Sequence, residues 1–301
     1  MHQYFRRSII LAGFAAMMAC SPQSMAGTKQ IDGKFDIGGR SIRLTCLGTS
    51  GPTVIVDAGL GTAPVEDRAW QGIAAKVAPL ARICLLDRAG LGGSDPAFKA
   101  LRTSADAADD LERATRSAGL KPPFVIVGHS IGGLNAQVFA SRHAEDVAAL
   151  VLVSSTHPDQ MRRWRALLPP AKPDDPKPLA AARDFLTTME HDPSKNPEKL
   201  DLLTSEVQAR KLGSLGDKPV MVLTQSPTWR MVPGLAEPLA VKLEDESQRM
   251  QKEFLRFSSN ARQWIALRAG HHLPDEDPAL VVAGISEAVI AVRNQKPEAS
   301  H

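Results

Sequence analysis

Short apolar runs bounded by turn residues recur along the chain and constrain its fold more than any other feature. Six of them follow one another: TVIVDAG, RICLLDRAG, FVIVGHS, ALVLVSS, PVMVLTQ and QWIALRAG. Unbroken apolar runs of this length suit strands buried on both faces, as in a parallel sheet. Helical patterns such as TSADAADDLERATRSAG and DPALVVAGISEAVIAVRN lie between them, and KFDIGGRSIRLTCLG predicts a hairpin before the first run. The alternation predicts an α/β fold with a mostly parallel central sheet flanked by helices.

One region, residues 157–218, interrupts this alternation after the sixth predicted strand. It carries the proline-rich stretches LPPAKPDDPKP and HDPSKNPEKL between helical patterns. The region is too long for a plain connection, so we expect a helical lid insertion over the edge of the sheet. The remaining residues, 27–156 and 219–301, then form one core domain.

The first 26 residues have the pattern of a bacterial secretory signal. A basic start, MHQYFRR, precedes the apolar run SIILAGFAAMMA and a small polar stretch that ends at Ala26. This order predicts export to the periplasm or the medium, with cleavage after Ala26. Two alternatives stay open. The protein could be an outer-membrane lipoprotein, attached to the membrane only through a lipid anchor at Cys20. It could also be a cytoplasmic protein that keeps the segment as an uncleaved N-terminal helix.

Composition and motif content exclude several classes of function. The net charge of +3 is small and the basic residues are scattered, so nucleic acid is not indicated as a partner. No P-loop, G-x-G-x-x-G, H-E-x-x-H or Cys/His ligand spacing occurs, so we expect neither a cofactor nor a metal. After removal of the signal, Cys46 and Cys84 remain, and they permit one disulfide in an oxidising compartment or two buried thiols.

The segment FVIVGHSIGGLNAQVF, residues 124–139, places a serine where a strand-like run ends and a helical pattern begins. Gly128 to Gly132 fit G-x-S-x-G, in the strand-then-helix context that this motif needs. A sharp turn there would expose Ser130 as a nucleophile, and the glycines leave room for it. The turn would also aim the Ile131 backbone N–H at the oxyanion that forms when Ser130 attacks a carbonyl. The alternative is a glycine-rich structural turn.

A serine needs a base to act as a nucleophile, and the C-terminal stretch LRAGHHLPDEDPALV supplies the candidate. His271 directly follows a glycine after the last strand-like run, where a turn would point it across the strand ends. The adjacent His272 would then point sideways, toward packing or a pocket. We expect structural roles for three other histidines, His129, His143 and His157, although His157 begins the insertion and could instead line the pocket.

Together these features resemble the α/β-hydrolase superfamily over nearly all of the chain after the signal. The landmarks run in the family's order: VIVDAGLG, LLDRAGLGGSD, VGHSIGG, LVLVSSTHPDQ and AGHHLPDEDPALV. Within the superfamily the chain is similar to small serine esterases and to proline-iminopeptidase-like members. Because AGLG corresponds to the oxyanion loop of relatives, the resemblance implies that the Leu60 N–H is a second oxyanion donor.

The resemblance has two structural implications as well. Asp87 and Arg88 match a structural turn of the family, so we assign them no catalytic role. The family's sheet order places the strand of Cys46 beside that of Cys84, which favours a disulfide between them.

The chain departs from the family at the acid that normally orients the histidine. Relatives carry it after one of two strands, and here the later position reads VLTQSPTWR, without a carboxylate. At the earlier position relatives often have Asp where this chain has Ser154. The nearest carboxylate is Asp159, our candidate for the acid, whereas Asp57 lies too far along the sheet. A Ser–His pair supported by water or by a polar group such as Ser154 stays open.

These residues predict a serine hydrolase of small carboxylic esters, with an acyl-enzyme on Ser130 and His271 as general base. Dehalogenases and epoxide hydrolases of this fold attack with aspartate, so Ser130 argues against both. Amidase, lactonase, aminopeptidase and C–C hydrolase activities could use the same site, and the missing acid also allows a non-catalytic binding protein. Trp164 and Trp229 could wall an apolar pocket over Ser130 or serve only in packing.

Overall fold

The computed structural model describes residues 31–295. The predicted signal segment lies outside the described residues, and so do the cleavage after Ala26 and the alternative lipid anchor at Cys20. Within the described residues, no helix combines the length and the apolar composition needed to cross a bilayer.

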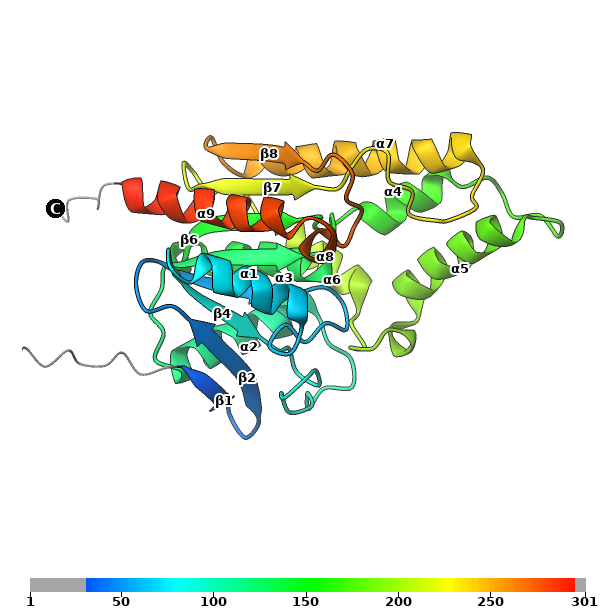
Figure 1. Cartoon of the computed structure of the whole chain (residues 1–301). Helices are drawn as coiled ribbons and strands as arrows, with labels where there is room; N and C mark the ends of the chain where they lie inside the picture. The colour runs from blue at the N-terminus through cyan, green and yellow to red at the C-terminus, as the bar shows by residue number, and fades with distance from the viewer. Residues whose placement is uncertain (1–30, 296–301) are drawn as a thin grey trace, which may run out of the picture.

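A sheet of eight strands forms the centre of the described chain, in the order β1-β2-β4-β3-β5-β6-β7-β8 (Figure 1). Strand β2 pairs antiparallel with β1 and β4, and all other neighbours pair in parallel. The predicted α/β fold with a mostly parallel sheet is confirmed. The strands are β1 (Asp32–Asp36), β2 (Ser41–Leu47), β3 (Thr53–Asp57), β4 (Arg82–Leu86), β5 (Phe124–His129), β6 (Val147–Val153), β7 (Val220–Thr224) and β8 (Ala261–Ile265).

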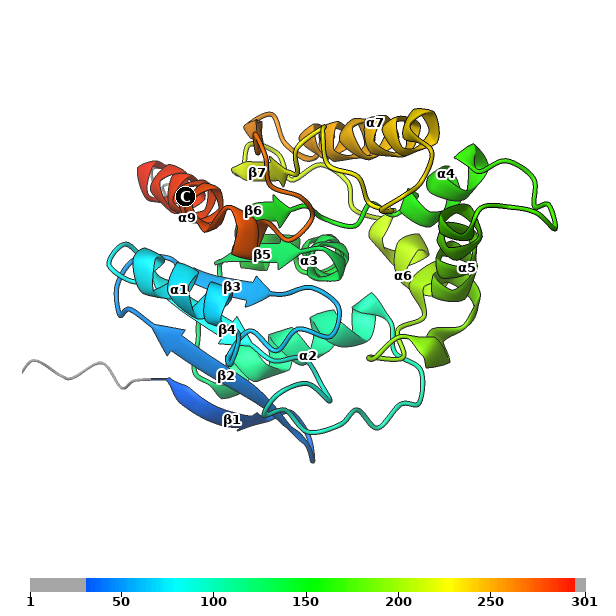
Figure 2. The same ribbon diagram turned by 45° about the vertical axis from the view of Figure 1, so that its right-hand side comes forward.

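Helices cover both faces of the sheet, which is why the central strands are apolar throughout (Figure 2). One face carries α1 (Arg68–Val77) and α9 (Pro278–Asn294), and the other carries α2 (Ser104–Ser117) and α3 (Ile131–Arg142). Alternate side chains of β3, β5 and β6 therefore enter two separate apolar cores. The other elements of the core domain are α7 (Glu237–Glu253), α8 (Leu273–Glu276) and the 3-10 helices η1 (Ala144–Asp146) and η3 (Phe254–Phe257).

The segment 157–218 contributes helices between β6 and β7. They are α4 (Gln160–Leu167), α5 (Lys177–His191) and α6 (Leu202–Ala209), with the 3-10 helix η2 (Pro193–Lys195) before α6. These helices lie beyond the carboxyl ends of the parallel strands, at the right of Figures 1 and 2. Ligands of open α/β sheets bind at that edge, so the insertion faces the region where a site is expected. That it acts as a lid stays a prediction.

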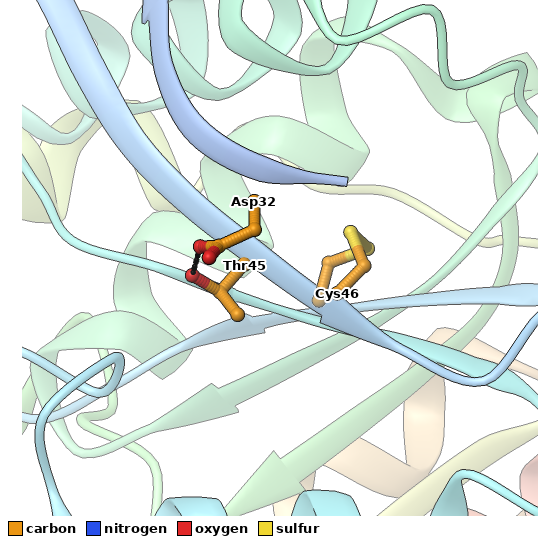
Figure 3. Close-up of a disulfide and its surroundings, with 4 residues drawn as sticks. Asp32, Thr45 and Cys46 are labelled. Carbon is orange, nitrogen blue, oxygen red and sulfur yellow. Dashed lines mark hydrogen bonds between the residues drawn. A yellow bond between two sulfur atoms is a disulfide. The ribbon is translucent and has the colours of Figure 1, made fainter. Parts of the chain in front are cut away.

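A disulfide joins Cys46 on β2 to Cys84 on β4, where the two residues are direct partners in the antiparallel register (Figure 3). Beside it, the Thr45 hydroxyl donates a hydrogen bond of 2.7 Å to Asp32, which ties β2 to β1. The bridge fastens the N-terminal hairpin to the parallel part of the sheet. The pairing is the one that the family resemblance implied.

Removing the disulfide should destabilise the fold, because the bridge closes a loop between residues 38 positions apart and restricts the unfolded chain. For the double variant Cys46→Ala/Cys84→Ala we expect the free energy of unfolding to fall by about 2–4 kcal/mol. Urea unfolding followed by circular dichroism measures this, with the wild-type protein in reducing buffer as the control. An unchanged unfolding midpoint in both samples would contradict a stabilising role for the bridge.

Candidate active site

Ser130 occupies a strained turn between the last residue of β5 and the first residue of α3. Its backbone adopts φ 56° and ψ −121°, and such a conformation costs a residue other than glycine ~1–3 kcal/mol. Neighbouring glycines make the turn sterically feasible. A Cβ on Gly128 would lie 2.5 Å from the Gly132 carbonyl oxygen, and one on Gly132 would lie 2.1 Å from that of Asp57. The packed backbone thus enforces the turn, and Ser130 stays partly exposed at its tip.

His271 lies within hydrogen-bonding distance of Ser130, with 2.8 Å between its Nε2 and Ser130 Oγ. The histidine belongs to the loop between β8 and α8. His129 Nε2 donates a hydrogen bond of 2.9 Å to the His271 backbone carbonyl, and the Trp229 indole stacks on the imidazole with 6.0 Å between ring centroids. These two contacts hold the imidazole over the turn. His272, the competing candidate, lines the cavity described below, but the hydrogen bond to Ser130 among the described residues comes from His271.

The other ring nitrogen of His271 meets a hydroxyl where relatives would place a carboxylate. Ser154 Oγ lies 2.8 Å from His271 Nδ1. Ser154 directly follows β6 and has φ 40°, a left-handed conformation that residues other than glycine rarely adopt. Its backbone N–H donates a hydrogen bond of 2.7 Å to the Leu223 carbonyl, which fixes this strained residue to β7. The hydroxyl considered from sequence as a polar support therefore faces the imidazole.

The structure does not place Asp159 beside His271, so the prediction that Asp159 is the catalytic acid was wrong. The Asp159 carboxylate accepts a hydrogen bond of 3.0 Å from Arg210 and pairs with Arg162 at 3.2 Å, at the start of α4. Burial opposes ionisation, but the two guanidinium groups outweigh it and lower the pKa of Asp159. Asp57 is engaged elsewhere too, because its carboxylate pairs with Arg88. Both carboxylates are satisfied by arginines away from the imidazole.

Leu60 and Ile131 line the same cavity as Ser130, and the role of their backbone N–H groups as an oxyanion hole stays a prediction. Within residues 31–295, neither N–H donates a hydrogen bond to a protein acceptor. The Leu60 loop is firmly held, because Arg88 donates bonds of 2.7 Å to the carbonyls of the two preceding residues. Glu198, from the insertion, accepts a bond of 2.8 Å from the Gly61 N–H and also pairs with Arg88. Arg88 thus has a structural role, because it holds the loop that carries Leu60.

Ser130 opens into a cavity of about 480 Å³. Its walls come from the serine turn, the Leu60 loop, the insertion helices and the loop after β7. Both tryptophans singled out from sequence, Trp164 and Trp229, line it. Among the described residues, the lining contains no Asp, Glu, Lys or Arg. A cavity of this size and character suits an uncharged, largely apolar ligand.

The electrostatic environment keeps His271 neutral. Part of its ring faces the cavity, but the surrounding protein desolvates the imidazole and, together with His129 and His272 nearby, lowers its pKa from 6.5 to about 3. Burial lowers the pKa of His129 to about 4 in the same way. A neutral imidazole can accept a proton from Ser130, so the arrangement suits general-base activation of a serine.

Three residues that support this site carry no clear mark in the sequence: His129, Glu198 and Gln225. His129 lies inside the G-x-S-x-G motif, where the pattern indicates only a structural role. Glu198 lies in the insertion, where no motif marks it. Gln225 lies in VLTQSPTWR, at the later position where relatives carry the acid, and its side-chain carbonyl oxygen lies 2.9 Å from Ser154 Oγ. The position where relatives carry the acid could therefore have pointed to Gln225. It did not, because the sequence comparison looks for Asp or Glu there and Gln225 is an amide.

The model of the α/β hydrolase fold family matches residues 52–284. The chain therefore belongs to the α/β-hydrolase family. An AB hydrolase superfamily protein of Gibberella zeae is 25% identical over 284 residues, covering 80% of this chain and 87% of that protein. A shorter match, 35% identical to the probable transporter efuK of Hormonema carpetanum, covers 35% of this chain and 15% of that protein.

Solved structures share the fold with this chain. A thermophilic esterase from Thermogutta terrifontis has a TM-score of 0.57 at 20% identity, covering 87% of this chain and 98% of that chain. A meta-cleavage product hydrolase has a TM-score of 0.57 at 16% identity, with the same coverage. At this level of identity the likeness shows the fold alone. Family membership supports a hydrolytic activity, while the bond that is cleaved depends on the residues of the site.

In the described part of the chain, His, Cys, Asp and Glu side chains form no group of three or more that could hold a metal ion. The candidate reactive groups at the cavity are the Ser130 hydroxyl and the His271 imidazole, which are in hydrogen-bonding contact.

Ser154→Asp tests the electrostatics of His271. Because its pKa is about 3, we expect kcat/KM of the wild-type protein with an uncharged ester to fall only when the pH drops toward 3. A carboxylate beside Nδ1 favours the imidazolium and should raise the pKa of His271 by ~1–3 units, so the variant should lose activity at a higher pH. A pH profile of kcat/KM measures this, with folding checked by circular dichroism at each pH. Identical acid limbs in the two proteins would contradict it.

Proposed function

We propose that the protein is a serine hydrolase that cleaves small, uncharged carboxylic esters. The observation that carries the proposal is the hydrogen bond of 2.8 Å between Ser130 Oγ and His271 Nε2 at the base of an uncharged cavity. A nucleophile, a neutral base and two free backbone donors are the parts that acyl transfer needs.

In the first half of the reaction, Ser130 attacks the ester carbonyl while His271 Nε2 accepts the hydroxyl proton. The carbonyl oxygen gains negative charge and is stabilised by the N–H groups of Leu60 and Ile131. The tetrahedral intermediate then expels the alcohol, which takes the proton from His271 and leaves an acyl group on Ser130. The left-handed backbone of Ser130 serves this step because it exposes the hydroxyl and directs the first N–H of α3 toward the oxyanion.

In the second half, water replaces the alcohol. His271 removes a proton from the water, which attacks the acyl carbonyl, and returns the proton to Ser130 Oγ as the carboxylic acid leaves. In both halves the imidazolium forms beside the Ser154 hydroxyl, whose oxygen lies 2.8 Å from His271 Nδ1, rather than beside a carboxylate. A hydroxyl accepts the Nδ1 hydrogen but brings no compensating negative charge, so we expect slower turnover than with a carboxylate in that place.

The uncharged lining favours ester cleavage over aminopeptidase activity on the same machinery. An aminopeptidase must hold the ammonium group of its substrate, and burying that charge without a partner is costly. Among the described residues, no carboxylate lines the cavity that could pair with it. The same reasoning disfavours anionic acyl groups, because no Lys or Arg of the described chain lines the cavity either.

Ser130→Ala tests the nucleophile. We expect a fluorophosphonate probe to label the wild-type protein and not the variant, and kcat for p-nitrophenyl butyrate to fall by at least ~10³-fold. Ser259→Ala, on the exposed surface, is a matched control that should label and turn over normally. Labelling that survives Ser130→Ala would contradict the assignment. Tight ligand binding without turnover in the wild-type protein would instead support a binding role for the fold.

A charge series of substrates tests the cavity. The p-nitrophenyl esters of pentanoic acid and of succinic acid have acyl groups of similar length, but the second carries a carboxylate. We expect kcat/KM for the anionic ester to be lower by at least ~10-fold, since its buried charge would lack a partner. Proline p-nitroanilide reports on peptidase activity and should be turned over more slowly than the neutral ester. Faster cleavage of either charged substrate would overturn the proposed substrate class.

We also propose that the mature protein works outside the cytoplasm. Support comes from the predicted signal and from the disulfide between Cys46 and Cys84, since disulfides persist mainly in oxidising compartments. Fractionation of cells that express the full chain should place the fluorophosphonate-labelled protein in the periplasm or medium. Label confined to the cytoplasm would contradict export.

A further inference from the structure

A chain of hydrogen bonds leads from His271 into the protein on the side away from Ser130. Ser154 Oγ lies 2.8 Å from His271 Nδ1 and 2.9 Å from the side-chain carbonyl oxygen Oε1 of Gln225. The Gln225 amide nitrogen Nε2 in turn lies 3.2 Å from Glu244 Oε1, on α7. The three supporting side chains are well buried, since Ser154, Gln225 and Glu244 are only 3%, 4% and 2% exposed.

The protons of this chain can be placed by elimination. The Gln225 Oε1 atom can only accept a hydrogen bond, so the single hydroxyl proton of Ser154 must point toward it. Ser154 Oγ then has only lone pairs to offer to His271, whose Nδ1 must carry the hydrogen. A neutral imidazole protonated on Nδ1 is bare on Nε2, and Nε2 is the atom that faces the Ser130 hydroxyl at 2.8 Å. This is the tautomer that a general base needs.

Glu244 determines which end of the Gln225 amide faces Ser154. Glu244 Oε1 accepts hydrogen bonds from two amide groups, Gln225 Nε2 at 3.2 Å and Gln248 Nε2 at 2.7 Å. An ionised carboxylate has no hydrogen to donate, so the amide nitrogen of Gln225 points to Glu244. The carbonyl oxygen of the same amide then points to Ser154.

The backbone at Ser154 gives independent support. Ser154 has φ 40°, in the left-handed region where side chains other than glycine are disfavoured. Such conformations cost ~1–3 kcal/mol and concentrate at functional sites, where the surrounding structure enforces them. Here the strained residue is the one whose hydroxyl joins His271 to Gln225.

We propose that Gln225, oriented by Glu244, is a positioning residue that sets the tautomer of His271 through the Ser154 hydroxyl. The catalytic consequence rests on the proposed serine hydrolase function, whereas the tautomer is a property of the resting protein. In relatives a carboxylate beside the histidine orients the ring. Here that orientation comes from Ser154 and Gln225, with the more distant Glu244 behind them. They do not place a charge beside the imidazole.

Gln225→Met is the test, because methionine keeps the approximate shape and removes both the acceptor for Ser154 and the donor to Glu244. The Ser154 hydroxyl is then free to donate to Nδ1, which allows the unproductive tautomer. We expect kcat for p-nitrophenyl butyrate to fall by roughly 10- to 10²-fold, less than the ~10⁴-fold cost of an enforced wrong tautomer. KM should stay within about two-fold, because the altered contact is not with substrate.

Two further variants separate positioning from a general loss of structure. Gln225→Glu retains an oxygen that accepts from Ser154 and, when protonated, a donor to Glu244, so it should recover most of the kcat lost in Gln225→Met. Gln263→Met is the matched control. Gln263 lies on β8, outside the site, and its amide donates a hydrogen bond of 2.8 Å to the hydroxyl of Thr224, the residue before Gln225. It should leave kcat unchanged.

Nitrogen-15 NMR of the resting protein reads the tautomer directly, with His271→Gln used to assign the signal. We expect a protonated Nδ1 and a bare Nε2 in the wild-type protein, and a mixture in Gln225→Met. A wild-type Nε2–H tautomer, or an unchanged tautomer and kcat in folded Gln225→Met, would overturn the proposal. The expected tautomers in a protein without esterase activity would support the positioning role and contradict only the proposed function.

Discussion

The hydrogen bond between Ser130 Oγ and His271 Nε2 is the contact on which the site depends, and it joins residues 141 positions apart. A serine hydroxyl is a weak nucleophile until a base takes its proton, so two distant segments of the chain must be brought together and held there. The parallel sheet does this because β5 and β8 end at the same edge. The strained turn raises Ser130 above that edge, while His129 and Trp229 hold His271 in place.

In the proposed mechanism, the unusual feature is that the partner of His271 on the side away from Ser130 is a neutral hydroxyl. A carboxylate beside a catalytic histidine both orients the ring and stabilises its charged form. Ser154 and Gln225 can orient the ring, since hydrogen bonding alone selects a tautomer, but they leave the imidazolium without a counter-charge. Burial, together with the nearby His129 and His272, lowers the pKa of His271 to about 3. Such a base stays neutral and available over a wide pH range but accepts its proton at a greater energetic cost.

The sequence was most informative where structure is determined locally. The strands, the hairpin and the turn at Ser130 were predictable because apolar runs and glycine positions indicate them directly. His271 was predictable from its place after a glycine and the last strand-like run, and the family resemblance implied the pair Cys46–Cys84. Of the support behind His271, the sequence indicated only Ser154, as one open alternative, and neither Gln225 nor Glu244 was predictable. Ser154, Gln225 and Glu244 come from three separate segments, and their contacts depend on side-chain directions in the folded chain. The prediction for Asp159 was wrong because nearness in sequence says nothing of the arginines that pair with it in the folded insertion.

The most direct test of the serine chemistry is to trap the acyl group on the protein. Rapid acid quenching of the reaction with p-nitrophenyl butyrate, followed by digestion and mass spectrometry, would locate the adduct. We expect a butyryl group on the peptide that contains Ser130, formed in a burst and lost again as water completes the cycle. Turnover of the ester with no adduct on that peptide, or with the acyl group on another residue, would contradict a reaction through Ser130.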